Sequence, residues 1–340
     1  MKTWFFLCPA VRLSYICILM NNKKPSAFLA AVRCAAVLIV IGVLTGCKNA
    51  DSNSGGEATV KDSAAQAQKF RFPDIPDSLT SVKSRGTYMA VHFWDHFDFS
   101  DTSLVHVPTL SEQAYIDFID VLVNVDTSAV QPAADALFGK AAANRRMTDY
   151  FLSLSEKYLY NLDSPFRSDE IYIRMLKSYL KSPFADRNST MRPEAHLESL
   201  LKNRMGTKAA DFSFVTTDHK SHNLYSINSE YTLVYFNSPT CPVCHETLEQ
   251  LKASPVITQA VADNKLAVLS VYPDTEGKLW MEHRSDMPRN WIYGWDEDFA
   301  ITEHMIYSIR TLPSLYLLDK DKKVLLKETT PEAVERYIRR

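Results

Sequence analysis

The sequence predicts two domains of different class: an all-helical domain over residues 70–204 and an α/β domain over residues 205–340, in which helices flank a mixed sheet. The 340 residues leave room for two domains. Apolar residues recur at helical spacing up to about Arg204, and from Gly206 onward short apolar runs alternate with helical stretches. A composition of 46% hydrophobic and 23% charged residues excludes a disordered chain and a multi-span membrane protein.

The first 46 residues are predicted to be a signal peptide. An apolar run from Ala35 to Leu44 follows basic residues and ends shortly before Cys47. Ten residues are too few to cross about 30 Å of hydrocarbon as a helix, but they fit the apolar region of an export signal. Such a signal does not need the residues before Met20, which is therefore a candidate start.

This arrangement resembles a bacterial lipoprotein signal. The resemblance implies that Cys47 receives a lipid, which would attach the protein to a membrane of the cell envelope on the periplasmic side. Lys48 directly after Cys47 resembles the sorting pattern for the outer membrane. Residues 47–69 are small and polar and cannot bury enough apolar surface to fold, so we expect a flexible tether.

The charge distribution argues against nucleic acid as a partner. Residues 1–46 hold five of the 38 Lys and Arg residues and none of the 40 Asp and Glu residues. The remainder carries 33 basic against 40 acidic side chains and has no basic stripe. We therefore expect no nucleic-acid binding.

The helical domain is predicted from stripes of apolar residues. Tyr115, Phe118, Ile119 and Leu122 follow one another at i, i+3, i+4 and i+7, behind a capping-box spacing that begins at Thr109. Further helices are expected around residues 151–158 and 172–180. The module resembles helical domains of unknown function that precede thioredoxin-like domains in some bacterial lipoproteins.

His92 and His96 are spaced as two zinc ligands on one helical face would be. Their neighbours are Phe and Trp, and no third ligand is fixed by the spacing. We therefore interpret these histidines as packing or capping groups, and we predict no metal site.

The α/β domain is expected to contain five elements after its first short runs, followed by a terminal helix. They are a buried strand at 232–236, a helix from the cysteines to Leu251, a helix at 256–261, a strand at 266–272 and a hairpin of 315–318 with 324–326. The terminal helix begins after Thr330-Pro331. Strands alternating with helices predict a mixed sheet covered on both faces.

The chemistry is predicted to lie in Cys241-Pro242-Val243-Cys244, between the first buried strand and its helix. With Cys8, Cys17 and Cys34 in the presequence and Cys47 lipidated, these are the only remaining thiols, which excludes a disulfide framework. At a helix start, unpaired N–H groups favour a thiolate on the first cysteine, and the second is placed to resolve a mixed disulfide. Proline at the first helical position loses no hydrogen bond there.

Residues 206–340 resemble a thioredoxin-like domain of the TlpA/ResA type. The resemblance rests on the two cysteines, the opening segment from Gly206 to Phe212 and the segment Tyr307 to Leu315. It implies that Pro313 is a cis-proline facing the cysteines and that the backbone of Leu312 pairs with an extended substrate strand. It also implies protein thiols and disulfides as partners, and no cofactor besides the redox-active disulfide.

This chain departs from the family pattern at positions around the cysteines. Thr240 replaces the usual tryptophan before the first cysteine, and Tyr235 stands where thioredoxins keep a buried acid. Thr247 stands where TlpA/ResA-type proteins keep a glutamate, and Glu246 points about 100° away on a helix. These departures bear on the rate and the pH optimum of the exchange and not on the exchange mechanism itself.

The sequence thus predicts a lipid-anchored thiol–disulfide oxidoreductase facing the periplasm. Its direction of electron flow stays open, because Pro242 resembles oxidising C-P-x-C centres whereas the surrounding domain resembles reducing ones. One alternative is covalent haem attachment, since Cys241 to His245 matches C-x-x-C-H. Another is a non-catalytic binding protein with a thioredoxin fold. A structural disulfide in so short a ring would stabilise little, and a zinc site lacks a second cysteine pair.

Overall fold

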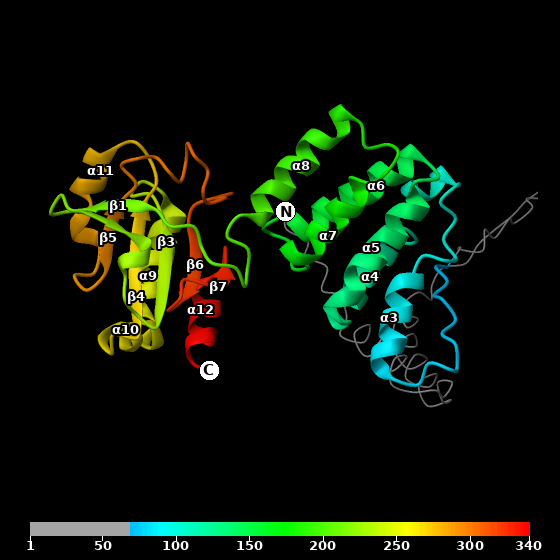
Figure 1. Ribbon diagram of the computed structural model, residues 1–340, viewed down its shortest axis with the longest axis horizontal. Coiled ribbons are helices and arrows are strands. Elements are labelled where there is room, and N and C mark those ends of the chain that lie inside the picture. The colour runs from blue at the N-terminus through cyan, green and yellow to red at the C-terminus, as the bar shows by residue number, and fades with distance from the viewer. Residues whose placement is uncertain (1–68) are drawn as a thin grey trace, which may run out of the picture. The chain divides into compact units, whose positions relative to one another are not determined.

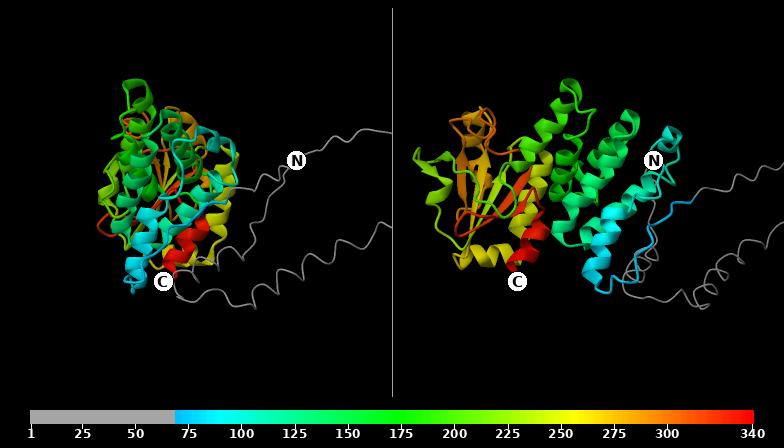
Figure 2. Two further views of the ribbon diagram at one scale, coloured as in Figure 1. Left: turned by 90° about the vertical axis from the view of Figure 1, so that its right-hand side faces the viewer. Right: turned by 45° about the vertical axis from the view of Figure 1, so that its right-hand side comes forward.

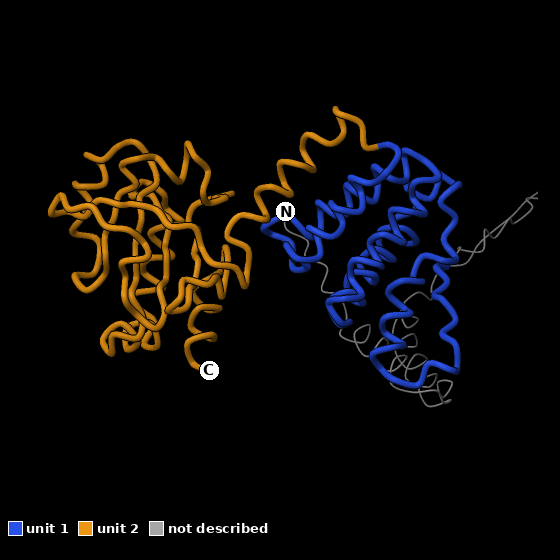
Figure 3. Tube along the Cα trace, in the orientation of Figure 1, with its two compact units in different colours: residues 1–184 blue, residues 185–340 orange. Residues whose placement is uncertain are grey.

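The computed structural model describes residues 69–340. The expected signal peptide, the candidate start Met20, the lipidation site Cys47 and all but the last residue of the tether lie outside the described residues. The chain divides into two compact units between Phe184 and Ala185 (Figure 3).

The first unit is helical, as the sequence predicts (Figures 1 and 2). Its described elements are α3 (Val82–His92), the short helix η1 (Thr102–His106), α4 (Glu112–Asn124), α5 (Thr127–Ala141), α6 (Arg145–Ser155), the π turn η2 (Glu156–Tyr160) and α7 (Asp169–Tyr179). Helix α5 packs against α3, α6 and α7. The N-cap side chains of α3, α5, α6 and α7 each accept a backbone N–H, which fixes where these helices begin.

An aromatic cluster forms part of the core of this unit. Trp94 lies at its centre and contacts the rings of Phe93, Phe97, Phe118 and Phe151. The aromatic residues of the segment that carries the paired histidines are therefore buried. His92 stacks on Tyr88, which fits the packing interpretation, whereas His96 is exposed, so that interpretation is wrong for His96.

The paired histidines and the start of α4 lie differently from what the sequence pattern predicts. Helix α3 ends at His92, whose Nδ1 lies 2.8 Å from Asp95 Oδ2, so His96 falls outside that helix. No group of three or more potential metal ligands occurs among the described residues. The cap expected at Thr109 is wrong, because α4 begins after Ser111, whose hydroxyl bonds Val107 O instead of capping the helix.

Helix α8 (Arg187–Leu201) lies before the expected boundary at residue 204 but belongs by its contacts to the second unit. Lys327 Nζ donates to the carbonyl oxygens of Leu200 and Lys202 at its C-terminal end. Asn203 Nδ2 donates to Ile306 O, and its Oδ1 accepts from Ala210 N. These bonds satisfy helix-end carbonyls that would otherwise lack partners, which ties α8 to the sheet domain.

The second unit contains a seven-stranded mixed sheet in the order β2-β1-β5-β4-β3-β6-β7. The strands are β1 (Ser213–Thr216), β2 (Ser221–Asn223), β3 (Tyr231–Phe236), β4 (Leu266–Tyr272), β5 (Ile292–Trp295), β6 (Ser314–Asp319) and β7 (Val324–Lys327). The central pairs β3–β4 and β4–β5 are parallel, and the remaining pairs are antiparallel. The expected buried strands and the closing hairpin are confirmed.

Helices cover one face of this sheet (Figure 1). They are α9 (Pro242–Ala253), α10 (Pro255–Ala262) and α12 (Pro331–Ile338), whose apolar residues pack on alternate side chains of β3, β4 and β6. Near β4 and β5, α11 (Gly277–Glu282) buries Trp280 against Tyr272 and Tyr293. The short helices η3 (Leu224–Ser226) and η4 (Arg284–Asp286) complete the unit.

The other face of the sheet is covered largely by irregular segments. Phe212 and Tyr307 pack there against Phe236, and the Tyr307 hydroxyl donates to Ala210 O. This face therefore holds the segment that leads to Pro313 close to the end of β3. Within residues 69–340, no helix is long and apolar enough to cross a bilayer.

Replacing two glycines by alanine is expected to change the free energy of unfolding in opposite directions. A Cβ at Gly294 in β5 would lie 2.7 Å from Phe214 Cδ2, so Gly294→Ala is expected to lower the free energy of unfolding by about 1–3 kcal/mol. Gly139, in the last turn of α5, has no neighbour within 4 Å of an added Cβ, and Gly139→Ala is expected to raise the same free energy by about 0.5–1 kcal/mol. Urea unfolding followed by circular dichroism measures both. Unchanged stability of Gly294→Ala would contradict the close contact of β5 with Phe214.

Candidate active site

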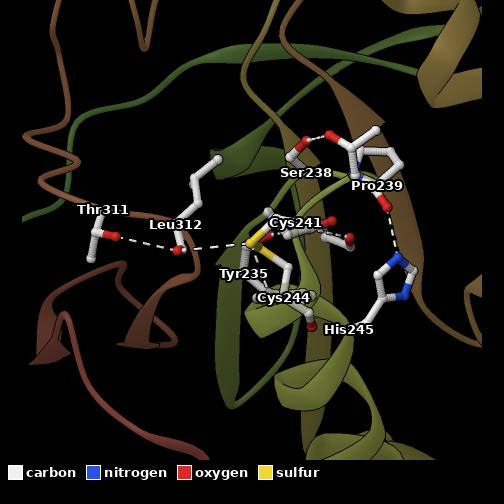
Figure 4. Close-up of a disulfide and its surroundings, with 11 residues drawn as sticks. Tyr235, Ser238, Pro239, Cys241, Cys244, His245, Thr311 and Leu312 are labelled. Carbon is white, nitrogen blue, oxygen red and sulfur yellow. Dashed lines mark hydrogen bonds between the residues drawn. A yellow bond between two sulfur atoms is a disulfide. The ribbon is translucent and has the colours of Figure 1, made fainter.

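The two cysteines lie where the buried strand β3 gives way to α9. Cys241 is the N-cap residue of α9 and has extended backbone angles, φ −90° and ψ 113°. Pro242 occupies the first helical position, where its missing N–H costs nothing. Cys241 and Cys244 form a disulfide across one helical turn, with their Cα atoms 5.2 Å apart (Figure 4). The expected strand-to-helix corner is present.

The two sulfurs differ in exposure and in hydrogen bonding. Cys244 is 2% exposed, whereas Cys241 is half-buried. The Cys241 Sγ accepts a hydrogen bond of 3.2 Å from Cys244 N, one of the backbone groups that lack a helical partner at the start of α9. In the reduced protein the same N–H group and the helix dipole stabilise a thiolate on Cys241. Cys241 is therefore suited to attack, and Cys244 is shielded.

The segment before β6 faces the disulfide. The peptide bond between Leu312 and Pro313 is cis, and Leu312 O lies 3.9 Å from Cys241 Sγ (Figure 4). Thr311 Oγ1 donates to the same carbonyl oxygen at 3.3 Å. Among the described residues, no group accepts a hydrogen bond from the Leu312 amide. The backbone beside Cys241 thus presents one main-chain donor to an incoming chain.

A buried ion pair fixes this segment to the end of β7. Arg310 Nε lies 3.0 Å from both carboxylate oxygens of Glu328, and Arg310 Nη2 also donates to Glu328 Oε2. The two side chains are 12% and 7% exposed. A planar guanidinium that meets a carboxylate in this way restricts orientation as well as distance. Arg310 and Glu328 therefore position the residues that face Cys241.

The residues at the positions of the missing acids carry no negative charge. Tyr235 is 1% exposed, and its hydroxyl donates to Cys244 O at 2.6 Å. Burial raises the pKa of Tyr235 far above its ordinary value, so the hydroxyl keeps its proton. Thr247 is buried, and Glu246 lies on the exposed side of α9. These contacts exclude Tyr235 as the group that accepts a proton from the cysteines.

A small cavity lies beside Cys244 and brings in residues that the sequence analysis did not single out. It measures about 10 Å³ and is lined on one side by residues of β3 and α9, among them Cys244. On the other side it is lined by His283 and Asp286, which follow α11. These two residues lie about forty positions after the cysteine pair in no recognisable spacing, so no sequence signal pointed to them.

His245 is bonded in a way that does not favour the haem alternative. Its Nε2 lies 2.6 Å from Pro239 O, and because a carbonyl oxygen only accepts, this nitrogen carries the proton (Figure 4). Thioether attachment of haem would use both sulfurs, which are here bonded to each other. The motif also sits inside a strand-helix unit of the sheet and not in a loop between small helices.

Comparisons with known proteins find relatives for the helical part of the chain and for the thioredoxin-like part. Residues 46–203 match a family described as a domain of unknown function, DUF5106. The crystal structure of a thioredoxin-like protein from Bacteroides caccae is 38% identical, with 80% of this chain and 98% of that chain covered and a TM-score of 0.74. The C-terminal domain of an uncharacterized protein from Bacteroides fragilis is 45% identical over 41% of this chain and 99% of its own, with a TM-score of 0.40.

A more distant structure has a functional description. The thioredoxin domain of a thiol–disulfide oxidoreductase from Bacteroides vulgatus is 20% identical and covers 39% of this chain and 97% of its own length, with a TM-score of 0.35. A comparison with curated proteins gives no match. The expected resemblance, a helical module of unknown function followed by a thioredoxin-like domain, is confirmed.

The difference in exposure predicts which thiol reacts first. After reduction, iodoacetamide at pH 7 is expected to modify Cys241 at least about tenfold faster than Cys244, since Cys241 is accessible and its thiolate accepts an N–H. Mass spectrometry of the tryptic peptide over time measures both rates. Equal rates would show that α9 does not shield Cys244.

Proposed function

The chain belongs to the family of thioredoxin-like proteins that includes the Bacteroides caccae protein, and we propose that it is a thiol–disulfide oxidoreductase of protein substrates. One observation carries the proposal: Cys241 and Cys244 form a disulfide at the start of α9, opposite the cis peptide bond of Leu312–Pro313. A disulfide that only stapled the chain would close a ring of four residues, which stabilises little.

The exchange proceeds in two steps. In the reduced protein, the Cys241 thiolate attacks one sulfur of a substrate disulfide, which releases one substrate thiolate and leaves a mixed disulfide on Cys241. Cys244 then attacks Cys241 Sγ, releases the second substrate thiolate and closes the internal disulfide. The substrate gains two electrons, and the cysteine pair loses two. The reverse sequence oxidises a substrate dithiol.

The substrate strand is held by main-chain contacts beside Cys241. Leu312 supplies an N–H that bonds no group among the described residues, and its carbonyl oxygen lies 3.9 Å from Cys241 Sγ, directly before the cis bond to Pro313. Pro242 keeps the start of α9 fixed while its neighbour Cys241 changes partners. Main-chain recognition of this kind suits protein substrates of varied sequence.

An insulin-reduction assay tests the enzyme against the non-catalytic alternative. With dithiothreitol as reductant, the wild-type protein is expected to accelerate precipitation of the insulin B chain, and Cys241→Ser is expected to fall to the rate without protein, because the attacking sulfur is gone. Cys244→Ser serves as the matched variant, since it keeps the attacking sulfur and is expected to accumulate mixed disulfide. Equal rates for wild type and Cys241→Ser would favour the binding protein.

We also propose that Cys47 carries a lipid that attaches the protein to a membrane of the cell envelope, on the periplasmic side. Support comes from the order of basic residues, apolar run and cysteine at positions 23–47. Lys48 favours the outer membrane. The folded units would then act at the end of the 47–69 tether.

Replacement of Cys47 tests the anchor. In cells that express the full chain, Cys47→Ala is expected to move the protein from the membrane pellet to the soluble fraction, because no acyl chain can be added. Mass spectrometry of the N-terminal peptide of the wild type should show the acyl mass on Cys47. A wild-type peptide without that mass would contradict the proposal.

A further inference from the structure

We propose that His283 exchanges the proton of Cys244 through one water molecule in the cavity beside that cysteine. The inference rests on the proposed function, because only a cysteine pair that cycles needs to move this proton. The cavity of about 10 Å³ is at the lower limit of what one water occupies. Cys244 and His283 both line it, from α9 and from the end of α11.

Cys244 needs such a route because it is 2% exposed. A thiol must lose its proton before it attacks a disulfide, and burial raises the pKa of a thiol by disfavouring the thiolate. Bulk water reaches Cys241 but not the shielded face of Cys244. A proton acceptor close to that face would therefore speed the second step of the exchange.

Five titratable side chains besides Cys244 line the cavity, and they are Tyr235, His245, His283, Asp286 and Tyr293. The two tyrosines among them cannot accept the proton of Cys244. Tyr235 donates its hydroxyl to Cys244 O, and Tyr293 donates its hydroxyl to Trp280 O at 3.1 Å. Burial holds the pKa of both phenols well above the ordinary value, so they stay protonated. The two histidines and Asp286 remain.

His283 is oriented to accept a proton. Its Nδ1 lies 3.0 Å from Leu279 O, one turn earlier, so Nδ1 carries the ring proton and Nε2 keeps a lone pair. Leu279 does not line the cavity. His283 itself lines the cavity and is half-buried, and its Nε2 bonds no protein group within residues 69–340, so we take Nε2 as the atom that accepts a proton from a water there.

Asp286 and His245 occupy different positions relative to this route. Asp286 is exposed and lines the cavity beside His283, and its backbone N–H donates to His283 O at 3.1 Å, so the His283 end of the cavity lies next to a solvent-exposed residue. His245 commits Nε2 to Pro239 O, and Figure 4 shows both nitrogens of its ring turned away from the sulfurs. The geometry thus favours His283 over His245.

The proton of Cys244 moves to solvent, and the electrons move to the substrate sulfur. With a mixed disulfide on Cys241, the Cys244 thiol gives its proton to the cavity water as that water gives one to His283 Nε2. The Cys244 thiolate attacks Cys241 Sγ, the bond from Cys241 to the substrate sulfur breaks, and the substrate leaves as a thiolate that takes a proton from solvent. The imidazolium then releases its proton at the exposed side, past Asp286.

Matched variants isolate this role. His283→Asn places an amide nitrogen where Nδ1 stands and keeps the bond to Leu279 O without a titratable group, and His283→Gln is a second variant in case the first folds poorly. His245→Gln is the control, because it keeps a donor to Pro239 O. The full protein is reduced and mixed with a peptide disulfide, and acid-quenched samples are resolved by mass to follow formation and decay of the mixed disulfide.

For His283→Asn we expect normal formation of the mixed disulfide and a decay at least about tenfold slower than wild type at pH 7, within the range for lost general-base catalysis. The deficit should shrink steadily as the pH rises above about 8.5, the ordinary pKa of a thiol, because a growing share of Cys244 then ionises without a base. His245→Gln should decay as the wild type does.

Three results would overturn the inference and leave the proposed function intact: wild-type decay in both His283 variants, slow decay in His245→Gln instead, or a deficit equal at every pH, which would indicate a structural role. Failure of the wild type to form any mixed disulfide would instead remove the proposed function.

Discussion

The placement of Cys241 at the N-cap of α9 is the constraint on which the site depends. An N-cap residue leaves the helix in extended conformation and directs its side chain back at the unpaired N–H groups of the first turn. The sulfur of Cys241 in that position accepts a hydrogen bond from Cys244 N, and Cys244 itself lies one turn later on the buried side of α9. One local geometry therefore gives the two thiols different exposure and different chemistry.

The rest of the second unit holds that corner against a second segment. Strand β3 fixes the start of α9 because its residues pair with β4 on one side and β6 on the other. The same β6 begins directly after Pro313, so the cysteines and Leu312 approach through adjacent strands. Arg310 and Glu328 then limit how far the Leu312 segment can move from Cys241. The distance between Cys241 and Leu312 is therefore set by the register of β3 and β6 more than by the loop before Pro313.

Sequence patterns predicted the elements that depend on neighbouring residues in the chain. They missed the contacts that arise only when distant segments pack together. The strands at 232–236 and 266–272, the helix start at Pro242 and the cis bond before Pro313 could be predicted from spacing and family resemblance. The cap at Thr109 was wrong because α4 begins only after Ser111, whose hydroxyl bonds Val107 O four residues earlier and contacts the Tyr150 hydroxyl of α6 at 2.8 Å. His283 could not be found, because only the packing of α11 near Cys244 brings it to the cavity.

The direction of electron flow depends on how strongly the groups around Cys241 stabilise its thiolate, and not on the Cys-Pro-Val-Cys sequence alone. The Cys244 N–H and the start of α9 stabilise the anion, which favours the reduced pair and makes the disulfide more oxidising. Leu312 O, 3.9 Å from the same sulfur, acts against the anion. If a substrate strand binds beside that carbonyl as proposed, it changes the balance at Cys241, and the reduction potential of the docked complex then sets the direction.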